Sequence, residues 1–292
     1  MSIAEYIKEK QLNRDELAIW FLGQAGFCIK TMSDVVMLID PYLSNYCQMR
    51  FGFKRMIPSI LHPDELAPDL MLITHKHADH LDPDSLPFFV RNEKTCFITA
   101  PDCCEALDRE NVPLERRCVL RIGDETERLG IRIRAVYADH GDLAPDAVGY
   151  EVHILGNVIY FAGDTSFRPK EITASLSEQP DIMITPINGE YGNMNGNEAC
   201  KLASRIRAKV LIGCHTGMFI EHGGDPAGFV LTAAKRLNNA LAMVMAPGEE
   251  LLYSRERGIC GQSFQDPLSN SRYKLIINQL KRNLIKSRNP ED

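Results

Sequence analysis

Apolar positions near the N-terminus change from a helical to a strand-like pattern at residue 18. Residues 3–17 carry apolar side chains at helical spacing and predict an amphipathic helix. Short apolar runs follow at 18–22, 26–30 and 35–39, with glycine or polar residues between them. Runs of this length, broken by turn residues, predict three strands joined as antiparallel hairpins.

Beyond residue 40, strand and helix patterns alternate. The apolar runs predict further strands at 70–74, 95–99, 126–139, 148–162, 182–185, 210–213 and 242–245. Helical patterns lie at 83–91, 102–110, 196–207 and 226–238, with Asn195 or Asn197 as a cap of the third. The chain has neither a short repeat nor a low-complexity linker. It therefore predicts an α/β fold in which two mixed sheets pack face to face with helices outside, each half of the chain supplying one sheet.

Both ends of the chain are expected to be helical additions to this unit. Residues 1–17 would form the N-terminal helix packed on the domain, and residues 18–262 the domain itself. Residues 263–292 would form a C-terminal helical extension, in which Arg272 to Ser287 have a basic amphipathic pattern. A helix packed on the domain with its charges in solvent is favoured over a membrane-binding or partner-binding helix.

Composition narrows the class of protein. A chain of 292 residues with 45% hydrophobic content can bury a proper core. Its net charge of −6, without a run of five like charges, argues against a nucleic-acid partner. The first ten residues lack the apolar core of a signal peptide, and no stretch has the length of a membrane span, so a cytoplasmic location without a membrane partner is expected. Nine cysteines without CxxC spacing fit buried thiols in a reducing compartment.

The segment from Thr74 to Asp82 is rich in metal-ligand side chains and directly follows an apolar run. Imidazole and carboxylate are ligands of Zn²⁺ and similar divalent metals. His75 and His77 are two residues apart, so they project to the same side of an extended chain. Asp79 and His80 follow where the chain turns and can reach a second position. The segment therefore predicts a metal site with room for two ions.

Later strands supply further candidates where their apolar runs stop. His140 follows the run at 131–138, Asp164 follows 158–163, and His215 follows 210–214. A glycine near each of them lets the backbone turn sharply and approach an ion.

These residues in this order resemble the metallo-β-lactamase superfamily, whose HxHxDH signature is matched by His75 to His80. The resemblance extends over about residues 20–250 and implies a four-layer αββα sandwich with metals at one edge of the two sheets. It also implies the distribution of ligands. One metal would be held by His75, His77 and His140, the other by Asp79, His80 and His215, with Asp164 bridging them. Asp40, which precedes Pro41, would lie behind the site and orient a ligand histidine; a simple turn is its alternative reading.

Two further segments, Ile19 to Phe27 and Asn188 to Gly192, resemble the branch that contains L-ascorbate-6-phosphate lactonase. This branch uses zinc or manganese. The lactonase has no histidine at the position of His140, so one metal ion is an alternative to two. The expected partner is a small-molecule substrate, and the loop residues that could contact it are Arg168, Lys170, Asn188, Tyr191 and His222. Assembly into a homo-oligomer stays open.

The leading functional hypothesis is a metal-dependent hydrolase in which a metal-activated hydroxide attacks a small ester or lactone, with or without a phosphate. Asp79 is the candidate general base and proton shuttle. The alternatives are a phosphodiesterase or nuclease on the same fold, an oxidoreductase, and a metal-binding protein without catalysis. His77 argues against the oxidoreductase, because diiron relatives carry glutamate at that position.

Overall fold

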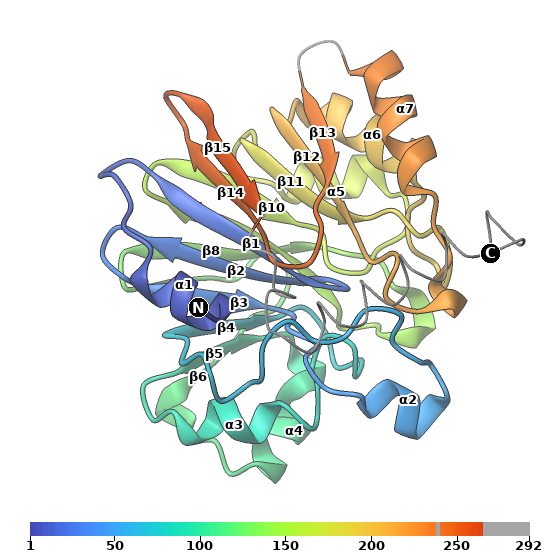
Figure 1. Cartoon of the computed structure of the whole chain (residues 1–292). Coiled ribbons are helices and arrows are strands. Elements are labelled where there is room, and N and C mark those ends of the chain that lie inside the picture. The colour runs from blue at the N-terminus through green and yellow to red at the C-terminus, as the bar shows by residue number, and fades with distance from the viewer. Residues whose placement is uncertain (238–239, 265–292) are drawn as a thin grey trace, which may run out of the picture.

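The apolar runs form two mixed β-sheets that pack face to face (Figure 1). The computed structural model describes residues 1–237 and 240–264. The first sheet has the strand order β15-β14-β1-β2-β3-β4-β5-β6. Its strands are β1 (Leu17–Gly23), β2 (Gly26–Thr31), β3 (Val36–Ile39), β4 (Leu70–Ile73), β5 (Cys96–Thr99), β6 (Arg117–Val119), β14 (Glu249–Ser254) and β15 (Gly258–Phe264). The expected hairpins β1-β2 and β2-β3 are antiparallel, whereas β3 to β6 are parallel.

The second sheet has the order β13-β12-β11-β10-β9-β8-β7. Its strands are β7 (Glu125–Arg128), β8 (Ile131–Tyr137), β9 (Val148–Ile154), β10 (Asn157–Phe161), β11 (Ile182–Pro186), β12 (Val210–Cys214) and β13 (Leu241–Val244). Strands β10 to β13 are parallel to one another. The pairs β7-β8, β8-β9 and β9-β10 are antiparallel.

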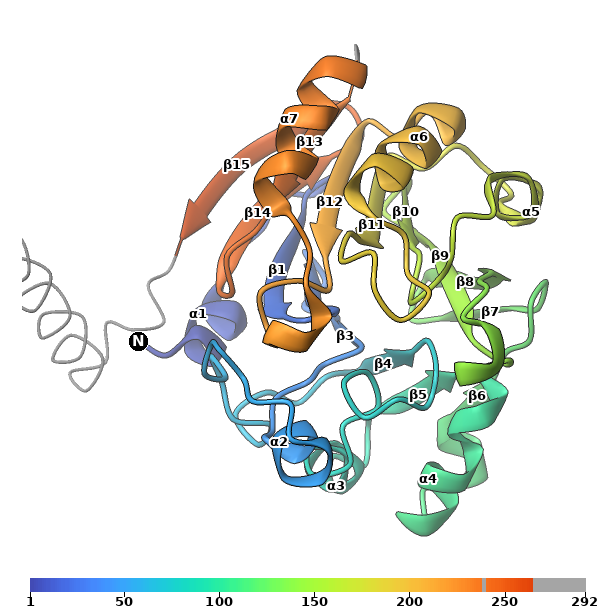
Figure 2. The same ribbon diagram turned by 90° about the vertical axis from the view of Figure 1, so that its right-hand side faces the viewer.

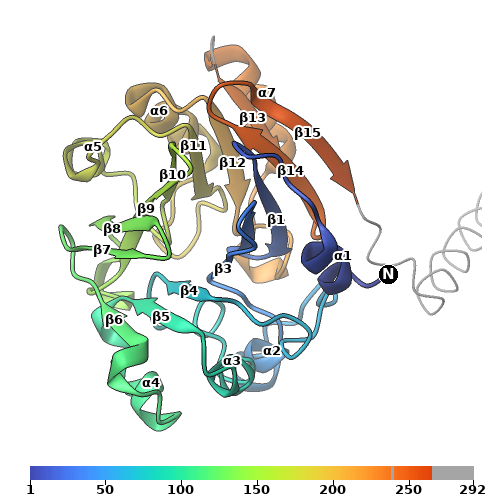
Figure 3. The same cartoon turned by 90° about the vertical axis from the view of Figure 1, so that its left-hand side faces the viewer.

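Helices cover the outer faces of both sheets and complete the predicted αββα sandwich. Figures 2 and 3 show α5, α6 and α7 over the second sheet, and α3 and α4 beside the β4-β5-β6 end of the first. The helices are α1 (Ile3–Glu9), α2 (Tyr46–Phe51), α3 (Leu86–Arg91), α4 (Cys104–Arg109), α5 (Pro169–Ser175), α6 (Gly196–Ile206) and α7 (Pro226–Arg236). None of the helices in the described part of the chain has the length and apolar character that a membrane crossing requires.

Alternating side chains of the second sheet feed two separate cores. Ile212 on β12 packs between the sheets, while its neighbour Leu211 packs under the outer helices. Ile159 and Tyr160 on β10 divide in the same way. This alternation follows from the two-residue period of a strand, and it leaves the strand ends free to carry polar side chains.

The N-terminal helix is shorter than expected. It ends at Glu9 rather than near residue 17, and Leu17 already belongs to β1. Its last carbonyls accept hydrogen bonds from the fully buried ammonium group of Lys30, at 3.0 Å from Ile7 and 2.6 Å from Lys8. These hydrogen bonds to β2 end the helix, because a further helical turn would need the same carbonyl oxygens as acceptors.

Two of the expected long strands are hairpins. Turns at Leu129-Gly130 and Leu155-Gly156 divide the predicted strands 126–139 and 148–162, and all four turn residues have positive φ. The expectation that each half of the chain supplies one sheet was also wrong. The C-terminal hairpin of β14 and β15 joins the first sheet beside β1, whereas β7 to β10 belong to the second sheet. The expected helix from Arg272 to Ser287 lies outside the described residues.

Candidate metal centre

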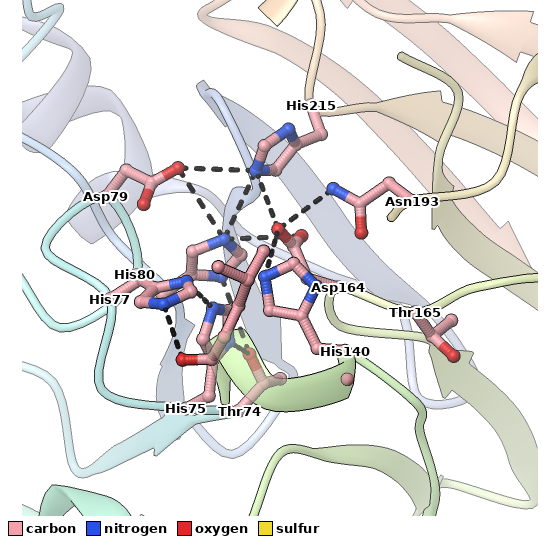
Figure 4. Close-up of polar contacts among 12 residues, drawn as sticks. Thr74, His75, His77, Asp79, His80, His140, Asp164, Thr165, Asn193 and His215 are labelled. Atoms are coloured by element: carbon pink, nitrogen blue, oxygen red, sulfur yellow. Dashed lines mark hydrogen bonds and ion pairs between the residues drawn. The ribbon is translucent and has the colours of Figure 1, made fainter. Parts of the chain in front are cut away.

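The candidate ligands meet at one edge of the sandwich because the strands that precede them run in the same direction. His75 follows β4 in the first sheet, and His140, Asp164 and His215 follow β8, β10 and β12 in the second. Figure 4 shows the side chains from both sheets converging on one point. All seven predicted ligands are brought together, although they span 140 residues of sequence.

The first group of donors consists of His75, His77 and His140, whose ring nitrogens all lie within 4.8 Å of one another. The Nε2 atom of His75 lies 2.9 Å from Nδ1 of His77. The opposite nitrogen of His77, Nε2, lies 3.1 Å from the carbonyl oxygen of Leu143. That carbonyl can only accept, so it fixes the His77 proton on Nε2 and leaves the Nδ1 lone pair facing the other two rings.

The second group consists of Asp79, His80 and His215, with ligand atoms again within 4.8 Å. Asp164 lies between the two groups. Its carboxylate oxygens are 3.3 Å from Nε2 of His80, 3.2 Å from Nε2 of His215 and 3.7 Å from Nε2 of His140. This is the place that the sequence predicts for a bridging carboxylate.

Two rings of the first group, those of His75 and His140, are electrostatically neutral. Burial, reinforced by the charge of nearby His80, holds the pKa of His75 well below its usual value. Burial likewise lowers the pKa of His140. Both rings are therefore unprotonated at neutral pH, which is the form that binds a metal.

The two carboxylates carry the negative charge of the site. Burial opposes the ionisation of Asp79 and Asp164, but the imidazoles of His80 and His215 outweigh it and hold both carboxyl pKa values well below their usual range. Although burial lowers the pKa of His215, the carboxylate of Asp164 in particular raises it to about 9. The site thus attracts positive charge strongly at its centre.

The contacts in this group fit a divalent cation. The Nε2 atoms of His80 and His215 face each other at 3.3 Å, and each also faces a carboxylate oxygen. Two protons cannot both occupy the space between these nitrogens, whereas one cation can accept both lone pairs. Imidazoles that give up their protons to a metal, combined with carboxylates, are a donor set that suits zinc and other first-row divalent ions. His75, His77 and His140 would hold one ion and Asp79, His80 and His215 another, with Asp164 able to reach both.

Asp40 lies behind the site and contacts one of these histidines. Its Oδ2 atom lies 2.9 Å from Nδ1 of His80 and accepts a hydrogen bond of 2.6 Å from the hydroxyl of Thr74. Its Oδ1 atom accepts a hydrogen bond of 2.8 Å from the backbone of Thr74. A carboxylate on Nδ1 fixes the Nδ1 proton and turns Nε2 toward the site. The backbone of Asp40 has a left-handed conformation, with φ of +44°.

Two residues with contacts in the site had no role in the sequence analysis. Gln24, in the β1-β2 turn, contacts Asp79 at 2.8 Å. Asn193 donates to Asp164 Oδ2 at 2.9 Å. Neither residue has a distinctive local pattern in the sequence. Asp82, at the end of the ligand-rich segment, instead accepts hydrogen bonds from the backbone of Leu43 and Ser44 and so fixes the loop after β3.

Comparisons with other proteins agree with the fold. A family model described as a beta-lactamase superfamily domain matches residues 18–215. The chain belongs to this superfamily. The UPF0173 metal-dependent hydrolase Ta0764 of Thermoplasma acidophilum is similar to this member, with 28% identity over 220 residues that cover 74% of the chain and 90% of the relative.

Two solved structures show the same fold as this superfamily member. Igni18, a metallo hydrolase from Ignicoccus hospitalis, has a TM-score of 0.65 and 23% identity, covering 82% of this chain and 99% of its own. The metallo-beta-lactamase fold protein YhfI from Bacillus subtilis has a TM-score of 0.61 and 15% identity, covering 82% and 100%. The predicted metallo-β-lactamase fold is therefore confirmed.

The loop residues expected to contact substrate divide into two sets in this superfamily member. His222 is buried against the site, with its ring stacked on His215 at a centroid distance of 4.8 Å, and Tyr191 lies beside it at 5.3 Å. Asn188 is buried on the same loop as Tyr191. Arg168 instead pairs with Asp139 at 2.6 Å, with its side chain 55% exposed. Lys170 is exposed on α5 and forms no hydrogen bond or ion pair with another described residue.

Proposed function

We propose that this protein is a hydrolase that uses two divalent cations, zinc or manganese, to cleave a small ester or lactone. The observation that carries the proposal is the position of the Asp164 carboxylate between two groups of three donors, from which it contacts His80, His140 and His215. Related proteins named metal-dependent hydrolases support the same class of reaction.

Asp79 is suited to moving a proton in this reaction. When bound, cations in such a site lower the pKa of a water molecule and polarise the substrate oxygen that they contact. The Oδ2 atom of Asp79 is fixed against Gln24 and His215, while its Oδ1 atom makes no hydrogen bond with another described residue (Figure 4). The carboxylate can therefore accept a proton from the attacking water and return it to the leaving oxygen as the C–O bond breaks.

The surface beside His215 supports an organic, ring-sized substrate. His222, Tyr191 and Phe53 form an aromatic wall, in which the Phe53 ring lies 5.6 Å from His222 and 6.3 Å from Tyr191. Flat or apolar groups pack well on such rings. Because Arg168 is already paired with Asp139, we rank unphosphorylated esters and lactones first. A phosphorylated lactone, as in the lactonase branch that the sequence resembles, ranks second.

Metal content and turnover test the proposal together. The wild type should contain two equivalents of zinc or manganese and hydrolyse members of an ester and lactone panel with release of acid. The double variant His75→Ala/His77→Ala should lose at least one equivalent, and its kcat should fall by roughly a thousandfold or more, since the first donor group is then broken. His62→Ala is the matched control, because His62 is exposed and outside the site.

Two results would contradict the proposal. One is a wild type that binds neither metal after expression in medium supplemented with both. The other is a fully metallated wild type that turns over no ester, lactone or phosphorylated lactone. Turnover of phosphodiesters alone would assign the site to the phosphodiesterase alternative instead.

A further inference from the structure

Gln24 lies in an unusual position for a residue in a hairpin turn. Its side chain is fully buried, and its backbone has a left-handed conformation with φ of +56°. The turn is packed tightly, because a Cβ atom at Gly26 would lie 3.2 Å from the carbonyl oxygen of Asp40 and 3.3 Å from Cα of Pro41. The carbonyl oxygen of Gln24 also accepts a hydrogen bond of 2.7 Å from the backbone of His215. The fold therefore holds this residue rigidly against the metal centre.

The side-chain nitrogen of Gln24 has three close neighbours. Nε2 lies 2.8 Å from Oδ2 of Asp79, 2.9 Å from Nδ1 of His222 and 3.1 Å from Nε2 of His215. The orientation of the amide follows from the first contact. A carboxylate oxygen can only accept, so the atom facing it at 2.8 Å must be the donating nitrogen rather than the amide oxygen.

The amide has two hydrogens for these three neighbours. Asp79 takes one, and Nδ1 of His222 is the nearer of the two remaining acceptors, so it takes the other. In the metal-binding form of His215, in which Nε2 has no proton, the Nε2 lone pair is then left without a hydrogen bond from Gln24. A free lone pair is what a metal ligand needs, and this nitrogen already points at Nε2 of His80 and at the carboxylates.

We propose that Gln24 is a positioning residue that fixes the Asp79 carboxylate and the His222 ring on the two sides of His215. The inference rests on the proposed function. By holding Oδ2 of Asp79, the amide directs this oxygen at the donor group formed with His80 and His215 and leaves Oδ1 turned away from it. By donating to His222, the same amide keeps this ring parallel to His215, with an interplanar angle of 4°. One side chain thus links a metal-binding residue to the aromatic wall.

Gln24→Met tests the proposal, because methionine has similar length but no donor. Residues that orient metal ligands typically contribute 10-fold to 100-fold in metal affinity. We expect one of the two zinc equivalents to bind about 10-fold to 100-fold more weakly in competition with a chromophoric chelator, while the other is unchanged. The visible spectrum of the Co²⁺-loaded protein should change, and kcat should fall more than tenfold with KM within about threefold of the wild type.

Gln24→Asn is the second variant, chosen for its ability to fold. Asparagine tolerates positive φ better than most residues, but its shorter side chain cannot reach Asp79. It should show the same loss of affinity and kcat as Gln24→Met. The matched control is Gln179→Met, since Gln179 also donates through Nε2, to the carbonyl of Arg207 at 2.8 Å, but outside the site.

The outcomes separate this inference from the function on which it rests. Suppose that the wild type binds two metals and hydrolyses esters. If either folded Gln24 variant then retains the affinity for both metals, the cobalt spectrum and the kcat of the wild type, the positioning role is wrong and the function stands. If the wild type binds no metal, the function is wrong and the role of Gln24 falls with it.

Discussion

In the proposed function Asp79 has two tasks, metal binding and proton transfer, which a single substitution can separate. Asparagine keeps the shape of the side chain and can still face His215, but it cannot accept a proton. General acid-base groups typically contribute 10²-fold to 10⁴-fold to a rate, so Asp79→Asn should lower kcat by roughly this factor. Steady-state kinetics on protein with measured metal content would check the prediction. Asp64→Asn, at an exposed carboxylate outside the site, is the control.

Metal analysis decides how a loss of rate at Asp79 is explained. A variant with full metal content and low kcat supports the proton-transfer role. A variant that keeps both its metal and its kcat would refute that role, whereas loss of metal together with rate would reduce Asp79 to a ligand.

Single residues differ in how far their sequence context reveals their contacts. His75 to His80 were recognisable because several ligand-type side chains fall within six positions. Asp40 could be placed behind the site only through the family resemblance. Gln24 could not be predicted, because its contact with Asp79 joins residues 55 positions apart and its local sequence, between glycines, is typical of any turn.

At the level of elements, the ends of strands were predicted better than their interiors. The residues that meet in the candidate metal centre could be selected because polar residues interrupt apolar runs where strands meet the site. The hairpin turns within 126–139 and 148–162 were missed because an apolar residue, Leu129 or Leu155, occupies the left-handed turn position. The pairing of β14 with β1 was missed as well, since it joins residues 230 to 236 positions apart.

An ion pair ties the N-terminal helix to this long-range pairing. Lys10, directly after α1, contacts the buried carboxylate of Glu250 on β14 at 2.6 Å. Burial alone would lower the pKa of Lys10, but the hydrogen bond and charge of Glu250 raise it above 10.5. Lys10→Met leaves the carboxylate buried without its partner, so it should lower the free energy of unfolding by roughly 2–4 kcal/mol at pH 7.

The pH dependence of this effect has a definite sign. Because the pKa of Lys10 is higher in the folded than in the unfolded state, its contribution is fully present below pH 10.5 and is lost as pH rises through the folded-state value. The free energies of unfolding of the wild type and Lys10→Met, measured in urea, should therefore differ at pH 7 and converge as the pH rises above 10.5. A constant difference across this range would exclude the ion pair as its cause. Lys8→Met, at an exposed position two residues before Lys10, is the control.

For the molecule as a whole, the candidate metal centre is also a connection between the two sheets. His75 and His80 come from the first sheet, whereas Asp164 and His215 come from the second. A ligand that binds only the folded state at a thousand times its dissociation constant stabilises a protein by about 4 kcal/mol. Removal of the metals should therefore lower the unfolding temperature considerably, by roughly 10 °C for a chain of this size.

Calorimetry of the protein before and after dialysis against a chelator would measure this change. Adding zinc or manganese back should restore the unfolding temperature, because the cations again bind the imidazoles and balance the charge of the buried carboxylates. His75→Ala/His77→Ala should respond less to the chelator than the wild type, since it has fewer ions to lose. If chelation shifts the two proteins equally, or shifts neither, the metals do not join the sheets, and packing between the apolar faces alone holds the sandwich together.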